Sequence, residues 1–189
     1  MPRSTGADEV GVVPPCPSRR PVAESGAPPP VPDVRLTAEL AAVVAAARRR
    51  AVRDGDRQTD TAHVLHTLLE SDPEVRAVFD GPQTARLLGY LVQRSIGYGL
   101  RWQGTVEDSG ALPVFGEPER WSPAAAGALN AARGRAARRG AAHVRGLDLL
   151  AAILMDSGSR AVEVLGRAGV DVLSLGERIA GTTGERIGA

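Results

Sequence analysis

Apolar positions from residue 36 onward recur at the three- and four-residue spacing of amphipathic helices. Thr37 is an N-cap candidate for the first such stretch, and Gly55 supplies its C-terminal stop. Asp60 or Thr61 caps a second helix on the same grounds. A third helix is expected to begin at Pro73, and a break at Gly81-Pro82 separates it from a fourth. The first half of the folded chain is therefore expected to be helical.

The same plan returns in the second half of the chain. Ser122 repeats the helix start at Thr37, and Gly140 repeats the stop at Gly55. The match continues at a constant offset through the turn and into the next helix, after which two more helices follow. We therefore expect an all-α fold in which two pseudo-symmetric four-helix repeats pack as one bundle.

The pattern also divides the chain into an arm, a folded domain and a tail. Residues 1–33 hold nine of the 14 prolines, so this stretch cannot bury enough apolar area to offset its ordering entropy and is expected to be a disordered Pro-rich arm. The folded domain is expected over 34–183 and the tail over 184–189. Within the domain we expect repeat one at 35–98, a Gly- and Pro-rich linker at 99–119 and repeat two at 120–181.

Composition agrees with helices. Apolar residues make up 43% of the chain but aromatic residues only 3%, so the core must be built from Ala, Val, Leu and Ile. Cys16 is the sole cysteine, which rules out an intramolecular disulfide and fits a reducing compartment. No apolar run approaches the roughly 18 residues of a membrane span, and no signal peptide is recognisable. We expect a cytoplasmic protein without a membrane partner.

Catalytic and metal-binding patterns are weak. All 23 basic residues are Arg, and without Lys there is no Schiff base and no P-loop lysine. No serine stands in a G-x-S-x-G context, so the sequence shows no set of catalytic residues for a hydrolase. We therefore expect no enzyme. His63 and His66 have the i, i+3 spacing of a chelating pair, but no third ligand is evident. We predict no metal and no cofactor.

Two arginine clusters are candidate binding surfaces. They occupy the last turns of matching helices and include Arg48 and Arg133. Cations there interact favourably with the helix dipole, which makes solvated helix faces the simpler interpretation. The alternative is an anion site for an acidic client segment or for nucleic acid. The net charge of +1 and the expected lack of exposed aromatic residues for base stacking disfavour nucleic acid. A helical nucleic-acid-binding regulator remains the second hypothesis.

The openings of the two copies resemble a known family. The first copy reads Arg35-Leu36-Thr37-Ala38 and then Asp60-Thr61-Ala62-His63-Val64-Leu65. The second copy reads Arg120-Trp121-Ser122-Pro123 and then Arg145-Gly146-Leu147-Asp148-Leu149-Leu150. These stretches resemble the R-F-T-x-R-A and G-T-E-H-[IL]-L motifs of the Clp N-terminal domain, or Clp repeat domain, which precedes the ATPase modules of ClpA- and ClpC-type Hsp100 unfoldases. The resemblance extends over residues 35–179.

The resemblance implies a non-catalytic receptor that docks client proteins or adaptors. It places ligand- or partner-binding residues at Thr37, Thr61, His63, Ser122, Gly146 and Asp148. In ClpC-type members the Glu of G-T-E-H helps bind phosphorylated arginine, but Ala62 and Leu147 stand at these positions here, where we expect them on the surface. Neither side chain can replace a carboxylate in a bidentate pair with a guanidinium group, which argues against phosphoarginine recognition by the family's mode.

The sequence also lacks the G-x-x-x-x-G-K-[ST] motif of an ATPase. We therefore expect a free-standing receptor domain that binds proteins, peptides or adaptors and modulates Clp-dependent proteolysis in a bacterium. Its expected partners are Clp unfoldase or protease components, their clients or their adaptors.

Overall fold

The computed structural model describes residues 34–95, 107 and 121–184. The arm predicted at 1–33, all of the linker predicted at 99–119 except residue 107, and tail residues 185–189 lie outside this part. The described residues belong to one compact unit, Pro32–Ala189. They form β1 Arg35–Leu36, α1 Ala38–Asp54, α2 Thr61–Ser71, α3 Pro73–Ala77, α4 Gly81–Ser95, α5 Pro123–Arg138, β2 His143–Val144, α6 Gly146–Leu154, α7 Arg160–Arg167 and α8 Val172–Thr183.

The two long helices α1 and α5 begin and end where the sequence predicts. The side chain of Thr37 accepts a hydrogen bond from the third residue of α1, and that of Ser122 accepts one from the third residue of α5. Each helix is followed by a glycine at positive φ, with 73° at Gly55 and 67° at Gly140. Of the two candidate caps for α2, Asp60 accepts the capping bond.

One predicted break is wrong. Gly81 and Pro82 do not lie between helices but form the first turn of α4. Proline is compatible with this position because the N–H groups of a first turn have no partner within the helix.

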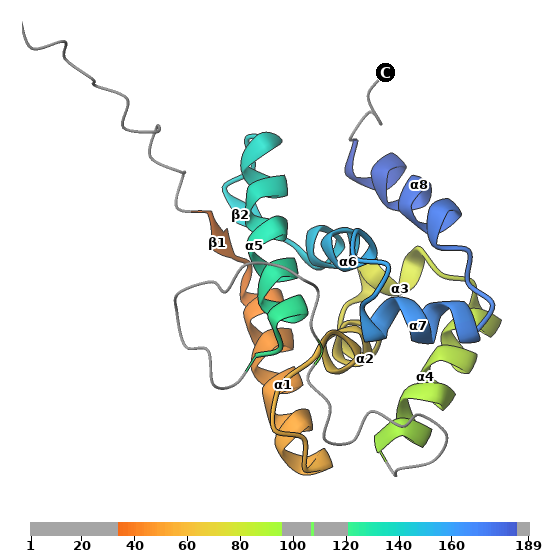
Figure 1. Cartoon of the computed structure of the whole chain (residues 1–189). Helices are drawn as coiled ribbons and strands as arrows, with labels where there is room; N and C mark the ends of the chain where they lie inside the picture. The colour runs from red at the N-terminus through yellow and green to blue at the C-terminus, as the bar shows by residue number, and fades with distance from the viewer. Residues whose placement is uncertain (1–33, 96–106, 108–120, 185–189) are drawn as a thin grey trace, which may run out of the picture. The chain divides into compact units, whose positions relative to one another are not determined.

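Helices α2 and α6 occupy the centre of the described unit (Figure 1). Helix α1 packs on α2, and α5 packs on α6. Helices α4 and α7 contact α2 from the other side, and α8 contacts α6. All residues from Thr61 to Leu69 and from Gly146 to Ile153 are buried, so these two helices carry most of the Leu-, Val- and Ala-rich core. None of the described helices is long and apolar enough to cross a membrane.

Two short parallel pairings join the repeats and were not predicted. In the first, β1 pairs with β2 and places Leu36 opposite Val144. In the second, Trp121 forms an isolated parallel bridge with Thr59. Trp121 follows Leu36, and Val144 follows Thr59, by the same 85 positions. The start of each repeat therefore pairs with the loop before the second helix of the other repeat.

Backbone hydrogen bonds repeat this exchange. The N–H of Thr37 donates to the carbonyl of Val144 at 3.0 Å, and the N–H of Ser122 donates to the carbonyl of Thr59 at 2.9 Å. Because each bond maps onto the other when the repeats are exchanged, the two repeats are related by a pseudo-twofold axis, as predicted.

Candidate functional site

A pocket of about 600 Å³ opens where the two repeats meet. Its lining includes Thr37 from the first repeat, Arg139, His143 and Arg145 from the second, and Thr183 and Gly184 at the end of α8. We call it the seam pocket. Two of these six residues are arginines and one is a histidine, and the pocket contains the predicted binding residue Thr37.

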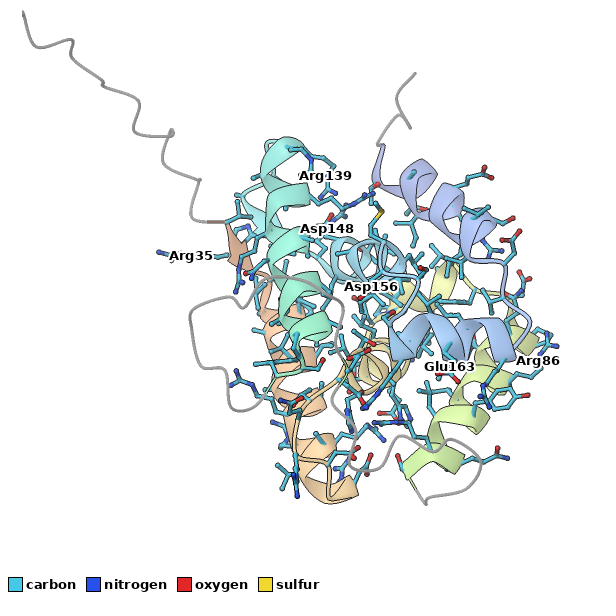
Figure 2. All side chains as sticks on the ribbon, viewed as in Figure 1. Arg35, Arg86, Arg139, Asp148, Asp156 and Glu163 are labelled. Carbon is cyan, nitrogen blue, oxygen red and sulfur yellow. The ribbon has the colours of Figure 1, made fainter. Side chains whose placement is uncertain are left out.

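Arg139 is held at the edge of the seam pocket by Asp148. Arg139 is the residue directly after α5. Its guanidinium makes two hydrogen bonds with the carboxylate of Asp148 on α6, with 3.0 Å between Nη2 and Oδ2 (Figure 2). Asp148 is fully buried and also accepts the backbone N–H of Arg145 at 3.0 Å. Asp148 was predicted to bind a ligand, but the structure shows it buried and orienting Arg139.

Arg145 is the more accessible cation of the seam pocket. Its side chain is 43% exposed, and Nη1 lies 3.6 Å from Oε2 of Glu74, whose side chain is also exposed. Exposed pairs of this kind contribute only about 0–1 kcal/mol. Arg145 can therefore exchange this partner for a ligand at little cost.

The equivalent place in the first repeat is a buried ion-pair network around Asp60 and His63. The carboxylate of Asp60 accepts hydrogen bonds from Arg94 and from Arg160, the latter at 2.6 Å. Nε2 of His63 lies 3.1 Å from Oδ2 of Asp56 and 3.2 Å from Nη1 of Arg94. His63 and Asp60 also form a capping box at the start of α2, so the predicted binding residue His63 is a core residue.

Burial and charge oppose each other in this network. Burial alone would lower the pKa of His63, but its hydrogen bonds with Asp56 and Asp60 outweigh this effect and raise that pKa above its usual value. Burial would raise the pKa of Asp60, but its hydrogen bonds with His63 and Arg160 and the charges of His63 and Arg94 hold that pKa well below its usual range. Both groups therefore favour their charged forms.

Among the described residues, Asp56, Asp60 and His63 place three ligand atoms within 4.8 Å of one another. The guanidinium of Arg94 donates to both carboxylates, at 3.0 Å to Asp56, and so stands where a cation would bind. We interpret the cluster as an ion-pair network and derive no metal site from it.

Glu107 is a buried residue that sequence reasoning missed. Its carboxylate accepts the backbone N–H of Thr61 at 2.9 Å, the hydroxyl of Ser122 at 2.7 Å and the backbone N–H of Arg160 at 2.7 Å. The hydroxyl of Thr61 donates to it as well. Glu107 thus joins the starts of α2, α5 and α7, and it is only 4% exposed. Because it stands in a Gly- and Pro-rich stretch without periodicity, no local signal marked it.

Three predicted binding residues therefore have structural partners. Thr61 and Ser122 are buried and bind Glu107. Gly146 is buried at the start of α6, where a Cβ atom would overlap the carboxylate of Asp72. A glycine is needed here because Asp72 caps α3 at this point of contact.

The expectation that Ala62 and Leu147 lie on the surface is wrong. Both side chains have no exposed area and belong to the hydrophobic core.

Arginines of both clusters contact other side chains of the chain. Arg48 lies over the ring of Trp121 at 5.1 Å, and Arg50 pairs with Glu70. Arg133 is exposed, and its guanidinium donates to Asn130 at 3.2 Å. Of these three contacts, only the pair of Arg50 with Glu70 offsets a positive charge that binding to nucleic acid would require.

A second pocket, of about 280 Å³, is lined mainly by small apolar side chains of α5 and α6. Ala128 and Ile153 line it, and Met155 at its edge is 81% exposed. Thr61 of the first repeat closes one side. We call it the apolar pocket.

No family model and no curated protein matches the chain. Solved structures do match it. The N-terminal domain of Hsp104 from Candida albicans is 14% identical, with a TM-score of 0.61 over 80% of this chain and 93% of that domain. The N-terminal domain of the caseinolytic protease associated chaperone ClpD from Arabidopsis thaliana is 14% identical, with a TM-score of 0.56 over 79% and 95%. A chain from a malarial protein secretion system is 15% identical, with a TM-score of 0.58 over 81% and 97%.

These similarities define the class of the fold. The chain has a Clp N-terminal-domain-like fold, with the all-α architecture that its repeated motifs predicted. At this level of identity the likeness is one of fold, so the site is argued from this chain's own residues.

Proposed function

We propose that this protein is a non-catalytic receptor that binds segments of client proteins or adaptors where its two repeats meet. The observation that carries the proposal is the presence of two pockets that each take residues from both repeats. One offers basic side chains and the other offers exposed apolar surface at Met155. A peptide segment with both polar and apolar groups suits this pair of pockets. The Clp N-terminal-domain-like fold supports the proposal by analogy.

Binding of an unfolded client tests the proposal directly. We expect fluorescein-labelled, permanently unfolded casein to bind the natural protein in an anisotropy titration. Met155→Asp places a charge at the edge of the apolar pocket and is expected to weaken binding by about tenfold. Val52→Asp is the matched control, because Val52 is 77% exposed on α1 and lines neither described pocket. Absence of binding to casein, or equal losses in both variants, would argue against the receptor.

The proposed consequence is competition with Clp unfoldases for their clients. In a reconstituted Clp unfoldase–protease assay, we expect the protein to slow degradation of labelled casein in proportion to its concentration. Met155→Asp should slow degradation less than Val52→Asp does. An unchanged degradation rate at concentrations that saturate casein binding would remove the regulatory part of the proposal.

A further inference from the structure

Asp156 carries the one charged side chain among the described residues that line the apolar pocket. It stands between the end of α6 and the start of α7 (Figure 2). Oδ1 of its carboxylate accepts the backbone N–H of Gly158 at 3.0 Å. Oδ2 has almost no exposed area and accepts no hydrogen bond from any described residue. One carboxylate oxygen at the wall of this pocket therefore lacks the partner that buried polar atoms normally have.

The other polar side chains of the apolar pocket already have partners within the chain. The hydroxyl of Thr61 donates to Glu107 and accepts a backbone N–H from the first turn of α7 at 3.0 Å. The hydroxyl of Ser159 accepts the backbone N–H of Val162 at 3.3 Å. Asp156 is therefore the side chain through which this pocket can bind a polar group of a ligand. Because an ionised carboxylate only accepts hydrogen bonds, that group must be a donor.

The charges around Asp156 favour a positively charged donor. The carboxylate of Glu107 lies one hydrogen bond behind Thr61 in the pocket wall and adds a second negative charge. Arg160, in the first turn of α7, donates its guanidinium to the buried carboxylate of Asp60 at 2.6 Å. No described residue forms an ion pair with Asp156. A ligand group that pairs with Asp156 is therefore expected to be a cation.

The apolar walls and the single available oxygen together suit lysine. Ala124, Ala128 and Ile153 line the pocket with methyl groups, against which an aliphatic chain can pack. Lysine has a four-carbon apolar stem and ends in a compact ammonium group. The planar fork of arginine pairs best with both oxygens of a carboxylate, but Oδ1 of Asp156 already accepts the N–H of Gly158. Every basic residue of this chain is an arginine, so another protein must supply the lysine.

We infer that the apolar pocket binds a lysine side chain of a client or adaptor segment, with the ammonium group on Oδ2 of Asp156 and the stem along the Ala-rich wall. The inference rests on the proposed receptor function and names the side chain that this pocket takes. The terminal torsion of aspartate is broad, so the carboxylate can turn Oδ2 toward the pocket when the ammonium group arrives. Met155, at the pocket edge, then contacts an apolar neighbour of the lysine.

Three defined peptides test the chemistry. Each contains Ala, Leu and Ser around one central residue, which is lysine, norleucine or arginine. All are acetylated at the N-terminus and labelled with fluorescein through a C-terminal cysteine, so that lysine carries the only ammonium group. At about 0.15 M salt, where charges more than about 8 Å apart are largely screened, we expect the lysine peptide to bind about tenfold more tightly than the norleucine peptide. Equal binding of these two would overturn the inference. The arginine peptide should bind more weakly than the lysine peptide, and equal or tighter binding would overturn the assignment to lysine.

Neutral variants of Asp156 locate the binding. Asp156→Asn keeps the shape of the side chain, and Asp156→Ser keeps an oxygen that can accept the N–H of Gly158. We expect both variants to bind the lysine peptide about tenfold more weakly and the norleucine peptide as the natural protein does. Glu177→Gln is the matched control, because it removes one negative charge from an exposed site on α8 that lines neither described pocket. Losses no larger than that of Glu177→Gln, in variants whose circular dichroism matches the natural protein, would show that the inference is wrong.

Binding of unfolded casein separates this inference from the proposed function. If casein binds and Met155→Asp weakens its binding, while the lysine and norleucine peptides bind equally, the receptor function stands and the lysine inference fails. If neither casein nor any of the peptides binds, both fail. A tenfold preference for lysine that is lost in Asp156→Asn and kept in Glu177→Gln supports both.

Discussion

Replacing Glu107 by alanine is the most informative single perturbation of this fold. The carboxylate is 4% exposed and accepts backbone N–H groups at the starts of α2 and α7, together with two hydroxyls. Alanine would leave the N–H groups of Thr61 and Arg160 without this acceptor in a buried place. Since Thr61 belongs to the first repeat and Arg160 to the second, the variant tests the junction of the repeats.

The magnitude follows from the type of bond. Hydrogen bonds to a charged group contribute about 1.5–3 kcal/mol each, and a buried N–H left without a partner costs about 1–3 kcal/mol. The four bonds share one carboxylate, so their contributions are not additive. We therefore expect Glu107→Ala to lower the free energy of unfolding by about 3–5 kcal/mol. Glu107→Gln keeps one acceptor oxygen and should lose about 1–3 kcal/mol, because its amide nitrogen must face one of the two N–H donors.

Urea unfolding followed by circular dichroism measures this free energy. The slope of the free energy of unfolding against urea concentration should be the same in the variant and the natural protein if only stability changes. In a domain of this size the loss corresponds to a fall in Tm of roughly 6–20 °C. Glu177→Ala is the control, because Glu177 is exposed on α8 and should change stability by less than about 0.5 kcal/mol. A loss below about 1 kcal/mol for Glu107→Ala would refute the role of Glu107 in joining the helix starts.

Three further predictions concern the core and its titration. Gly146→Ala should lower the free energy of unfolding in urea by about 1–2 kcal/mol, because the added methyl group displaces the carboxylate of Asp72 from the cap of α3. Leu65→Ala removes a fully buried side chain and should cost about 2–5 kcal/mol in the same assay; a smaller cost would show that the site collapses around the cavity. The pKa of His63 is raised, so its stabilising contribution is complete below its unfolded value of about 6.5 and is lost as pH rises through the folded pKa. The pKa of His66 is lowered to about 4, chiefly by burial, so its contribution is lost as pH falls from about 6.5 toward 4. Urea titrations at a series of pH values should show the free energy of unfolding falling at higher pH because of His63 and falling at lower pH because of His66. His63→Gln should remove only the fall at higher pH. If that fall is unchanged in His63→Gln, His63 is not its cause.

The sequence by itself determined the local structure of this protein. Thr37 and Ser122 begin α1 and α5, and Gly55 and Gly140 end them, because capping and positive φ depend on residues within one helical turn. The repeated plan of these signals also fixed the fold class, since matching helices must bury matching apolar faces. The predicted helix break at Gly81-Pro82 was wrong, because proline is compatible both with a break between helices and with the first turn of a helix.

The tertiary structure alone decided the chemistry of the site. Asp60 receives Arg94 and Arg160 from 34 and 100 positions away, and no local pattern marks such partners. The burial of Leu147 was likewise invisible, because the start of a helix faces solvent or core according to what packs on it. Ion pairing depends on distance in space, whereas capping depends on distance along the chain.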